Sequence, residues 1–370
     1  MTARSAFDAD TRSMLCESLQ RFGREDHYAT AGDSSEDATN RARHAWRSIA
    51  AQGWLGLGLP QTAGGYGAFS ADLGLLLSIA GAARWRLPLV ECLGEACGAL
   101  LAAPLTPNAG ELLGKVVAGE AVVLMAASHV DPGNVATSAA ASGGGWRLTG
   151  RAQRVRTADL CTHLLVEARN AADGERGLYL IERSAAGIGV ACGVTVDAQP
   201  ATLFDLHNVQ AHRLAGSVAI DAGRRRAQLL ASCESLAIAQ AALDATKQHL
   251  ASRKQFGQPI LQFQAVQHRL VGVYLRIREL RALLAATQVA YDDRHPKLDR
   301  LLWQLQAQAS ATAIKATQES IQLHGGMGMT AEMPLGDYYK RVLLLQSLFG
   351  SYELALDRLA DTLEFQHEVA

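Results

Sequence analysis

The sequence predicts a mainly α-helical protein with a small antiparallel β domain in its middle, because the period of its apolar residues changes twice. Apolar residues recur at helical spacing up to about residue 120. From Ala121 to about residue 216 they form short runs separated by glycines, and from Ala219 the helical spacing returns. We therefore expect a helical domain at residues 1–120, a β domain at residues 121–216 and a helical domain at residues 217–370.

The first domain opens with a helical stripe between Met14 and Phe22 and contains an alanine- and leucine-rich run of helix length at residues 73–83. Residues 30–40 are polar, so we expect a surface loop there. The strand-like runs of the middle domain lie at residues 122–126, 146–149, 162–166 and 177–181. The last domain is helical except at residues 292–296 and at a glycine turn over residues 325–328.

The overall charge and the basic residues exclude a nucleic-acid-binding protein. The formal net charge is −1, and no clustered basic face is evident. The short arginine groups at residues 41–47 and 224–226 are expected to be solvated helix ends. A strand-glycine-helix dinucleotide site is also unsupported, because the segment from Gly56 to Gln61 lacks the third glycine and carries Pro60 where a helix should begin.

The cysteines and the N-terminus point to a cytoplasmic protein. The six cysteines are scattered without Cys-x-x-Cys spacing, so we interpret them as free thiols and expect no metal site. The N-terminus lacks the basic start and apolar core of a signal peptide. No run reaches the roughly 18 apolar residues that a membrane span needs.

A donor-rich loop, residues 253–267, lies between two long helical stripes. Arg253 offers a planar fork of donors that suits a phosphate, and Gln255 and Gln264 add amide donors. A second glycine turn, residues 322–328, also follows a helical run, so the two turns could meet around one anionic ligand. Residue chemistry alone leaves a second interpretation open, in which the arginine is a solvated helix end and the glycines cap a helix.

With its other motifs, this loop resembles the acyl-CoA dehydrogenase family, flavoproteins that desaturate acyl-CoA thioesters between the α and β carbons. The resemblance spans most of the chain, and the motifs that carry it are Gly53-Trp-Leu-Gly-Leu-Gly-Leu-Pro60, Gly64-Gly-Tyr-Gly67, Gly144-Gly-Trp-Arg-Leu-Thr-Gly150, Arg253-Lys-Gln-Phe-Gly257 and Gln322-Leu-His-Gly-Gly326. It implies a helical domain, a β-barrel domain and a C-terminal four-helix bundle. It also implies FAD as cofactor, an acyl-CoA substrate and a flavoprotein as electron acceptor.

The resemblance also implies which residues bind the cofactor. In the family, the last two motifs hold the ADP half of a neighbouring subunit's FAD. That role falls here on Arg253, Gln255, Phe256, Gln264, Gln322, Gly325 and Gly326.

The positions that would carry out the chemistry depart from the family. The family's glutamate base lies in a turn that aligns here with Phe349, or on a helix at a position that aligns with Ala227. Neither residue accepts a proton, so we identify no catalytic residue. The two segments that meet the flavin ring are also altered, at residues 126–133 and 152–157, where Ser128 and Thr157 are the only substitutes and neither is at the matching place.

An intact ADP motif beside an altered ring site fits a subunit that lends contacts and receives few. Residues 322–330, 338–341 and 348–350 resemble the small, base-lacking subunits of two-component bacterial acyl-CoA dehydrogenases that act on dicarboxylate or steroid-derived CoA thioesters. We therefore expect a chain that lends contacts to the FAD of a second dehydrogenase subunit, in a heterotetramer. One alternative is a complete homo-oligomeric enzyme with a relocated base, for which Glu234 is the candidate, although a carboxylate in such an apolar run is more often the partner of an arginine. A second alternative is a non-enzymatic oligomerisation scaffold, which the retained Arg253 disfavours.

Overall fold

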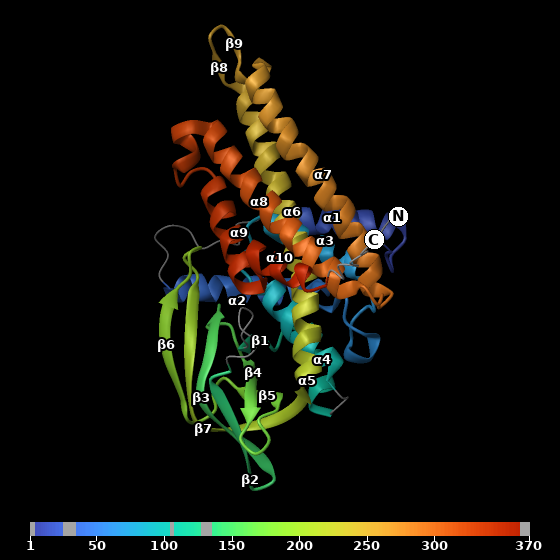
Figure 1. Ribbon diagram of the computed structural model, residues 1–370, viewed down its shortest axis with the longest axis vertical. Coiled ribbons are helices and arrows are strands. Elements are labelled where there is room, and N and C mark those ends of the chain that lie inside the picture. Colours follow the sequence, from blue (N-terminus) through green and yellow to red (C-terminus); the bar gives the residue numbers. More distant parts are fainter. Residues whose placement is uncertain (1–3, 25–34, 104–106, 127–134, 363–370) are drawn as a thin grey trace, which may run out of the picture.

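The computed structural model describes residues 4–24, 35–103, 107–126 and 135–362 and arranges them as a helical body with a β domain at one end (Figure 1). The helices that precede the sheet are α1 (Ala9–Gly23), α2 (Ser35–Ala51), α3 (Ser70–Ala82), a π-helix (Val90–Ala96) that continues into α4 (Cys97–Ala102), and α5 (Pro107–Val117). The N-terminal helical domain and the apolar run at residues 73–83 are thus present, and the run lies almost entirely within α3. The expected loop at residues 30–40 is wrong in its second half, because α2 begins at Ser35.

The β domain is a small barrel. Its strands are β1 (Val123–Ala126), β2 (Thr137–Ser142), β3 (Gly145–Arg156), β4 (His163–Asn170), β5 (Arg176–Glu182), β6 (Ile188–Val194) and β7 (Pro200–Gly216). The pairings β4–β2, β2–β3, β3–β7, β7–β5 and β5–β4 form a closed ring, with β1 added on β4 and β6 on β7. The prediction of a purely antiparallel domain needs correction, because β4 pairs in parallel with both β1 and β2.

The C-terminal part is a helical bundle built around one long helix. Its elements are α6 (Ser217–Ser252), the short hairpin strands β8 (Lys254–Gln255) and β9 (Gln258–Pro259), α7 (Gln264–Asp292), α8 (Leu298–His324), α9 (Leu335–Phe349) and α10 (Tyr352–Ala360). Helix α6 follows β7 directly and has 36 residues, which corresponds to about 54 Å. It runs from the barrel through the centre of the body to the hairpin tip (Figure 1).

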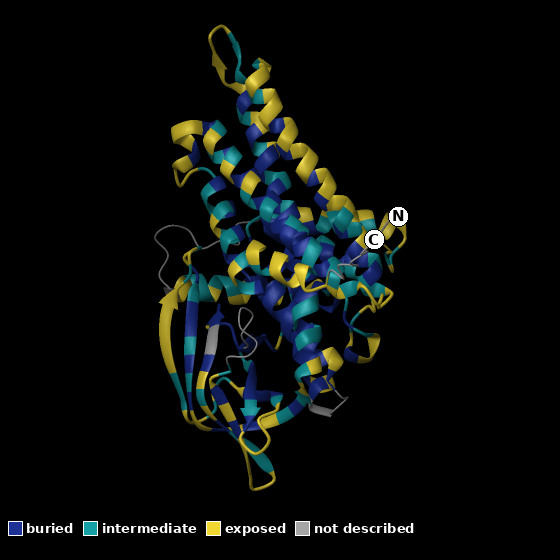
Figure 2. Cartoon of the chain, viewed as in Figure 1, coloured by how far each residue is buried: buried dark blue, intermediate teal, exposed yellow. Residues whose placement is uncertain are grey.

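Buried residues concentrate along α6, whereas α7 and the hairpin tip are largely exposed (Figure 2). Small residues let neighbouring helices approach α6 closely. A Cβ atom added to Gly223 would lie 2.5 Å from the carbonyl oxygen of Glu95, and one added to Gly81 would lie 2.6 Å from Cγ of Glu234. No helix in the described part of the chain is long and apolar enough to cross a membrane.

One arginine of the 224–226 group joins the N-terminal helices to α6. Arg226 is 8% exposed. It donates from Nε to the carbonyl oxygen of Leu93 at 3.0 Å and from Nη2 to that of Gly58 at 2.8 Å. The expectation of a solvated helix end is therefore wrong for Arg226, since main-chain carbonyls replace water around its guanidinium group.

Gly223→Ala should lower the free energy of unfolding by about 1 to 3 kcal/mol, because the added methyl group meets the main chain of the π-helix and overpacks the contact. Denaturant unfolding measures the change. The matched control is Gly272→Ala on the exposed face of α7, where an added Cβ meets nothing within 4 Å. Helix propensity alone should stabilise that variant by up to about 1 kcal/mol. Equal effects of the two substitutions would contradict the packing argument.

Candidate functional site

The seven residues expected to bind the ADP half of FAD lie at the end of the helical body that points away from the barrel (Figure 1). Arg253 caps the C-terminus of α6, Gln264 begins α7, and Gly325 caps α8. All seven are exposed. The two motifs, 69 residues apart at Arg253 and Gln322, are brought to the same end because α6 and α8 pack against each other with their C-termini together.

The β8–β9 hairpin holds an aromatic ring outside the body of the protein. Its two central residues, Phe256 and Gly257, have φ values of 53° and 80°. Positive φ at both positions is the geometry of a tight two-residue hairpin turn, which glycine adopts freely and phenylalanine adopts at a cost. The Phe256 side chain is 92% exposed and makes an edge contact with Phe263, with ring centroids 6.2 Å apart. A strained, exposed aromatic residue at a protruding tip indicates a contact with something outside this chain.

In the glycine turn after α8, the fold of this chain requires glycine at positions 325 and 328 but not at position 326. Gly325 has φ 63° and ψ −142°, a conformation open essentially to glycine alone. Gly328 is also constrained, because an added Cβ would lie 2.6 Å from the carbonyl oxygen of Ile321. Gly326 has neither constraint, since its φ is not positive and an added Cβ would meet nothing within 4 Å. The absence of a side chain at Gly326 therefore suits the close approach of a group from outside the chain.

Two histidines that the sequence analysis did not single out connect the motifs. His249 of α6 and His324 of α8 stack with ring centroids 4.3 Å apart and an interplanar angle of 17°. His324 stands inside the glycine motif, directly before Gly325, which was the available signal. His249 carried no signal, because its role depends on the packing of two helices that are distant in sequence.

Both positions where the family places its base are filled by close packing. Ala227 is completely buried, and an added Cβ on Gly94 would lie 3.2 Å from its Cα. Phe349 is 3% exposed, and its carbonyl oxygen accepts a hydrogen bond of 3.5 Å from Nε2 of Gln228. Neither place offers a carboxylate or a nearby polar side chain that abstracts a proton.

Glu234, the candidate for a relocated base, is fully engaged in a buried ion pair. Nε and Nη2 of Arg341 donate to its two carboxylate oxygens at 2.6 and 2.9 Å. Arg341 lies on the facing helix α9, and its pKa is held above the ordinary value because the Glu234 and Glu91 carboxylates outweigh the effect of burial. The interpretation of Glu234 as the partner of an arginine on a facing helix is therefore confirmed, and we identify no proton acceptor at this position.

The ion pair is part of a larger cluster that reaches the end of β3. Arg156 donates from Nε to Oε1 of Glu91 at 2.8 Å, and Nη1 of Arg156 lies 3.8 Å from Asp197. Nη1 of Arg341 lies 3.7 Å from the same oxygen of Glu91. Burial disfavours the charged form of Glu91, but Arg156 and Arg341 outweigh it and hold the pKa of Glu91 below its ordinary value. Glu91 thus stays ionised at neutral pH.

The described residues of the ring segment do not fit a flavin ring. The Thr157 hydroxyl is buried and donates to the carbonyl oxygen of Arg156 at 2.7 Å. The Arg156 guanidinium is committed to the ion cluster, and the cavity beside Glu234 and Arg341 measures about 30 Å³, which is room for water only. Ser128, the other candidate, lies outside the described residues.

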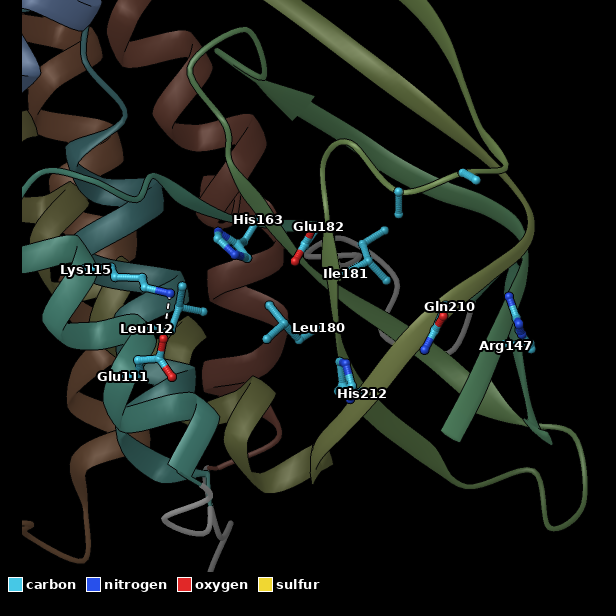
Figure 3. Close-up of a pocket in the computed structure, with 12 residues that line it drawn as sticks. Glu111, Leu112, Lys115, Arg147, His163, Leu180, Ile181, Glu182, Gln210 and His212 are labelled. Carbon is cyan, nitrogen blue, oxygen red and sulfur yellow. Dashed lines mark ion pairs between the residues drawn. The ribbon is translucent and has the colours of Figure 1, made fainter. Parts of the chain in front are cut away.

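A wider cavity of about 500 Å³ lies between α5 and the barrel (Figure 3). The charged and histidine side chains that line it are Lys115 and Glu111 on the helix side, and His163, Glu182, His212 and Arg147 on the sheet side. Both signs of charge are present, and Lys115 is paired with Glu111 at 2.6 Å. The described residues contain no group of three His, Cys, Asp or Glu side chains placed to hold a metal ion.

Glu234→Gln should lower the free energy of unfolding by about 3 to 5 kcal/mol, because it removes the carboxylate to which the buried Arg341 donates both of its hydrogen bonds and leaves only the longer contact with Glu91. Thermal and denaturant unfolding measure the loss. The matched control is Glu111→Gln, which breaks an exposed pair four residues apart on α5 and should leave stability almost unchanged, because solvent screens an exposed ion pair. A Glu234→Gln variant as stable as the control would show that this ion pair contributes nothing to the fold.

Comparison with known proteins identifies the C-terminal bundle. The family described as "Acyl-CoA dehydrogenase, C-terminal domain" matches residues 222–364. The acyl-CoA dehydrogenase IpdE2 of Mycobacterium tuberculosis is 35% identical over 133 residues, which are 36% of this chain and 40% of that protein. The matches to the first curated relatives span between 40 and 63% of those proteins' own length.

Two solved structures are similar over nearly the whole chain. A variant of the Tcur3481-Tcur3483 steroid ACAD has a TM-score of 0.81 and 28% identity, covering 95% of this chain and 98% of that chain. The ChsE4-ChsE5 complex from Mycobacterium tuberculosis has a TM-score of 0.84 and 20% identity, covering 96% of this chain and 97% of that chain. The helical domain, β domain and C-terminal helical domain expected from the sequence are therefore confirmed as one known fold.

Proposed function

We propose that this chain, which belongs to the acyl-CoA dehydrogenase family and has its fold, is the non-catalytic subunit of a heteromeric, FAD-dependent acyl-CoA dehydrogenase. The observation that carries the proposal is the contrast between two sites. The ADP motif is intact and exposed at the tip, while both base positions and the described ring segment are packed shut. Such a chain contributes contacts to a flavin that another subunit holds.

The tip residues fit the diphosphate and adenosine part of FAD, the cofactor bound by homologues. Arg253 presents a guanidinium fork that matches phosphate oxygens, and Gln255 and Gln264 present amide donors around it. Gly326 leaves room for the main chain to approach a ligand, and Phe256 offers a flat face beside them. When bound, FAD supplies the acceptor for the hydride that leaves the β carbon of the acyl-CoA thioester.

The partner in this proposal is a second acyl-CoA dehydrogenase subunit. It would supply the carboxylate base and the flavin-ring contacts that we do not find among the described residues of this chain, and the reduced complex would pass electrons to a flavoprotein acceptor. The two similar structures described as a steroid ACAD and as a two-protein complex support a heteromer and a steroid-derived acyl group. Exposed apolar side chains on α7 also suit a subunit interface, namely those of Val271, Tyr274 and Leu275.

The two alternative functions have less support. A complete homo-oligomeric enzyme needs a base of its own. The candidate, Glu234, accepts hydrogen bonds from Arg341 on both carboxylate oxygens, so it is not free to take a proton from a substrate. A pure scaffold has no use for a strained Phe256 or for an unconstrained glycine at position 326 beside an exposed arginine.

Arg253→Ala should weaken FAD retention by the complex about ten- to a hundredfold without unfolding this chain, because a charged hydrogen bond contributes roughly 1.5 to 3 kcal/mol. The complex is obtained by co-expression with a candidate second acyl-CoA dehydrogenase subunit, and flavin absorbance is titrated on the apo complex. Gly326→Ala should likewise lower FAD affinity while leaving the melting temperature unchanged.

Gly328→Ala is the control for the glycine turn. It should lower the melting temperature, because its methyl group meets the carbonyl oxygen of Ile321. If Arg253→Ala and Gly326→Ala both retain normal FAD affinity, the tip is a surface feature and the proposed function is wrong.

The chain expressed alone should purify with no stoichiometric flavin and should dehydrogenate no acyl-CoA, because the part of the chain that the structure describes offers neither a base nor a fitting ring segment. An absorbance spectrum of the purified protein is the measurement. A yellow homo-oligomer with one flavin per chain would instead establish the complete enzyme.

A further inference from the structure

We infer that His249 and His324 are positioning residues that hold the two halves of the ADP-binding tip at a fixed spacing. This inference rests on the proposed function, because it assigns the pair a role toward the cofactor motif. The geometry that points to it is the stacked ring pair, because its two histidines lie at the helix ends that lead into Arg253 and Gly325.

Each histidine is linked through the main chain to a motif residue. The amide N–H of Arg253 donates to the carbonyl oxygen of His249 at 3.0 Å, so the last turn of α6 connects the two. His324 is the last residue of α8 and directly precedes Gly325. Because the rings stack 4.3 Å apart, a shift of one helix end displaces the arginine relative to the glycine turn. The packing of α6 on α8 joins the same two segments.

The His324 ring is held from three sides. Its Nδ1 lies 2.8 Å from the carbonyl oxygen of Ser320, so Nδ1 donates to that oxygen. Gly328 packs beneath it, since an added Cβ there would lie 3.0 Å from Cβ of His324. Nε2 is buried and has no hydrogen-bond partner among the described residues. These contacts and the stack on His249 fix the position of the ring at the end of α8.

The surroundings of His249 favour the neutral form of its imidazole ring. The pKa of His249 lies below its ordinary value of 6.5. Burial is the largest cause, and the neighbouring His324 of α8 and Arg253 at the end of α6 lower it further. A group with a lowered pKa binds its proton more readily when its site opens, so the stack is stable above about pH 6.5 and weakens as the pH falls below that value. FAD affinity of the complex should fall over the same range.

The test compares three variants in the co-expressed complex, with FAD affinity as the first readout. His249→Ala removes the stack and should weaken FAD binding about tenfold, the loss expected from one misplaced hydrogen-bonding group. His249→Phe keeps a flat ring without a titrating group, so it should restore affinity at pH 7.5 and flatten its decline between about pH 7 and 5.5. Thr246→Ala, one turn earlier on α6, removes a side chain that is more deeply buried than His249 and lies away from the stack, so it should lower the melting temperature without changing affinity.

Hydrogen exchange on the flavin-free complex is the second readout, and it separates this inference from the proposed function. His249→Ala should speed exchange at residues 253–262 and 325–329, whereas Thr246→Ala should not. Unchanged exchange at both segments, or an affinity loss in Thr246→Ala equal to that in His249→Ala, overturns the positioning role. If exchange responds as expected but Arg253→Ala leaves FAD affinity intact, the histidines still position the tip and only the proposed function fails.

Discussion

The close approach of other elements to helix α6 is the constraint on which the rest of the structure depends. The helix leaves the barrel directly from β7 and is buried over most of its length. Gly223, Ala227 and Cys233 let the π-helix and α3 pack at main-chain distance, and Arg226 ties the carbonyl oxygens of two N-terminal segments to it. One element therefore sets the position of the barrel end, the filled base sites and the exposed tip.

The same packing explains why buried charge occupies the region beside α6 instead of catalytic groups. Ionising a lone buried carboxylate is costly, so Glu91 and Glu234 are tolerated only with Arg156 and Arg341 against them. A general base must accept a proton near neutral pH, whereas these contacts stabilise the ionised carboxylate. The cluster thus serves to join β3, the π-helix, α6 and α9.

The tip follows the opposite principle, since its polar groups are left exposed. Arg253 and the glycine turn emerge at helix ends, where main-chain groups and side chains face outward. Phe256 is held in a strained backbone conformation, and Gly326 leaves open space beside it, yet no contact described within this chain explains either feature. An assembly with a second subunit gives both of them a physical reason.

The sequence by itself determined the order of helical and β domains, the turns at the ends of α6 and α8, and the absence of a carboxylate at Ala227 and Phe349. These features are local, because periodicity, glycine turns and side-chain chemistry are written in adjacent residues. Only the tertiary structure decided the parallel pairing of β4, the burial of Arg226, the Glu234–Arg341 pair and the histidine stack. Each of those joins segments distant in sequence, and the partner of a buried polar group is chosen by which elements pack together, which no local pattern encodes.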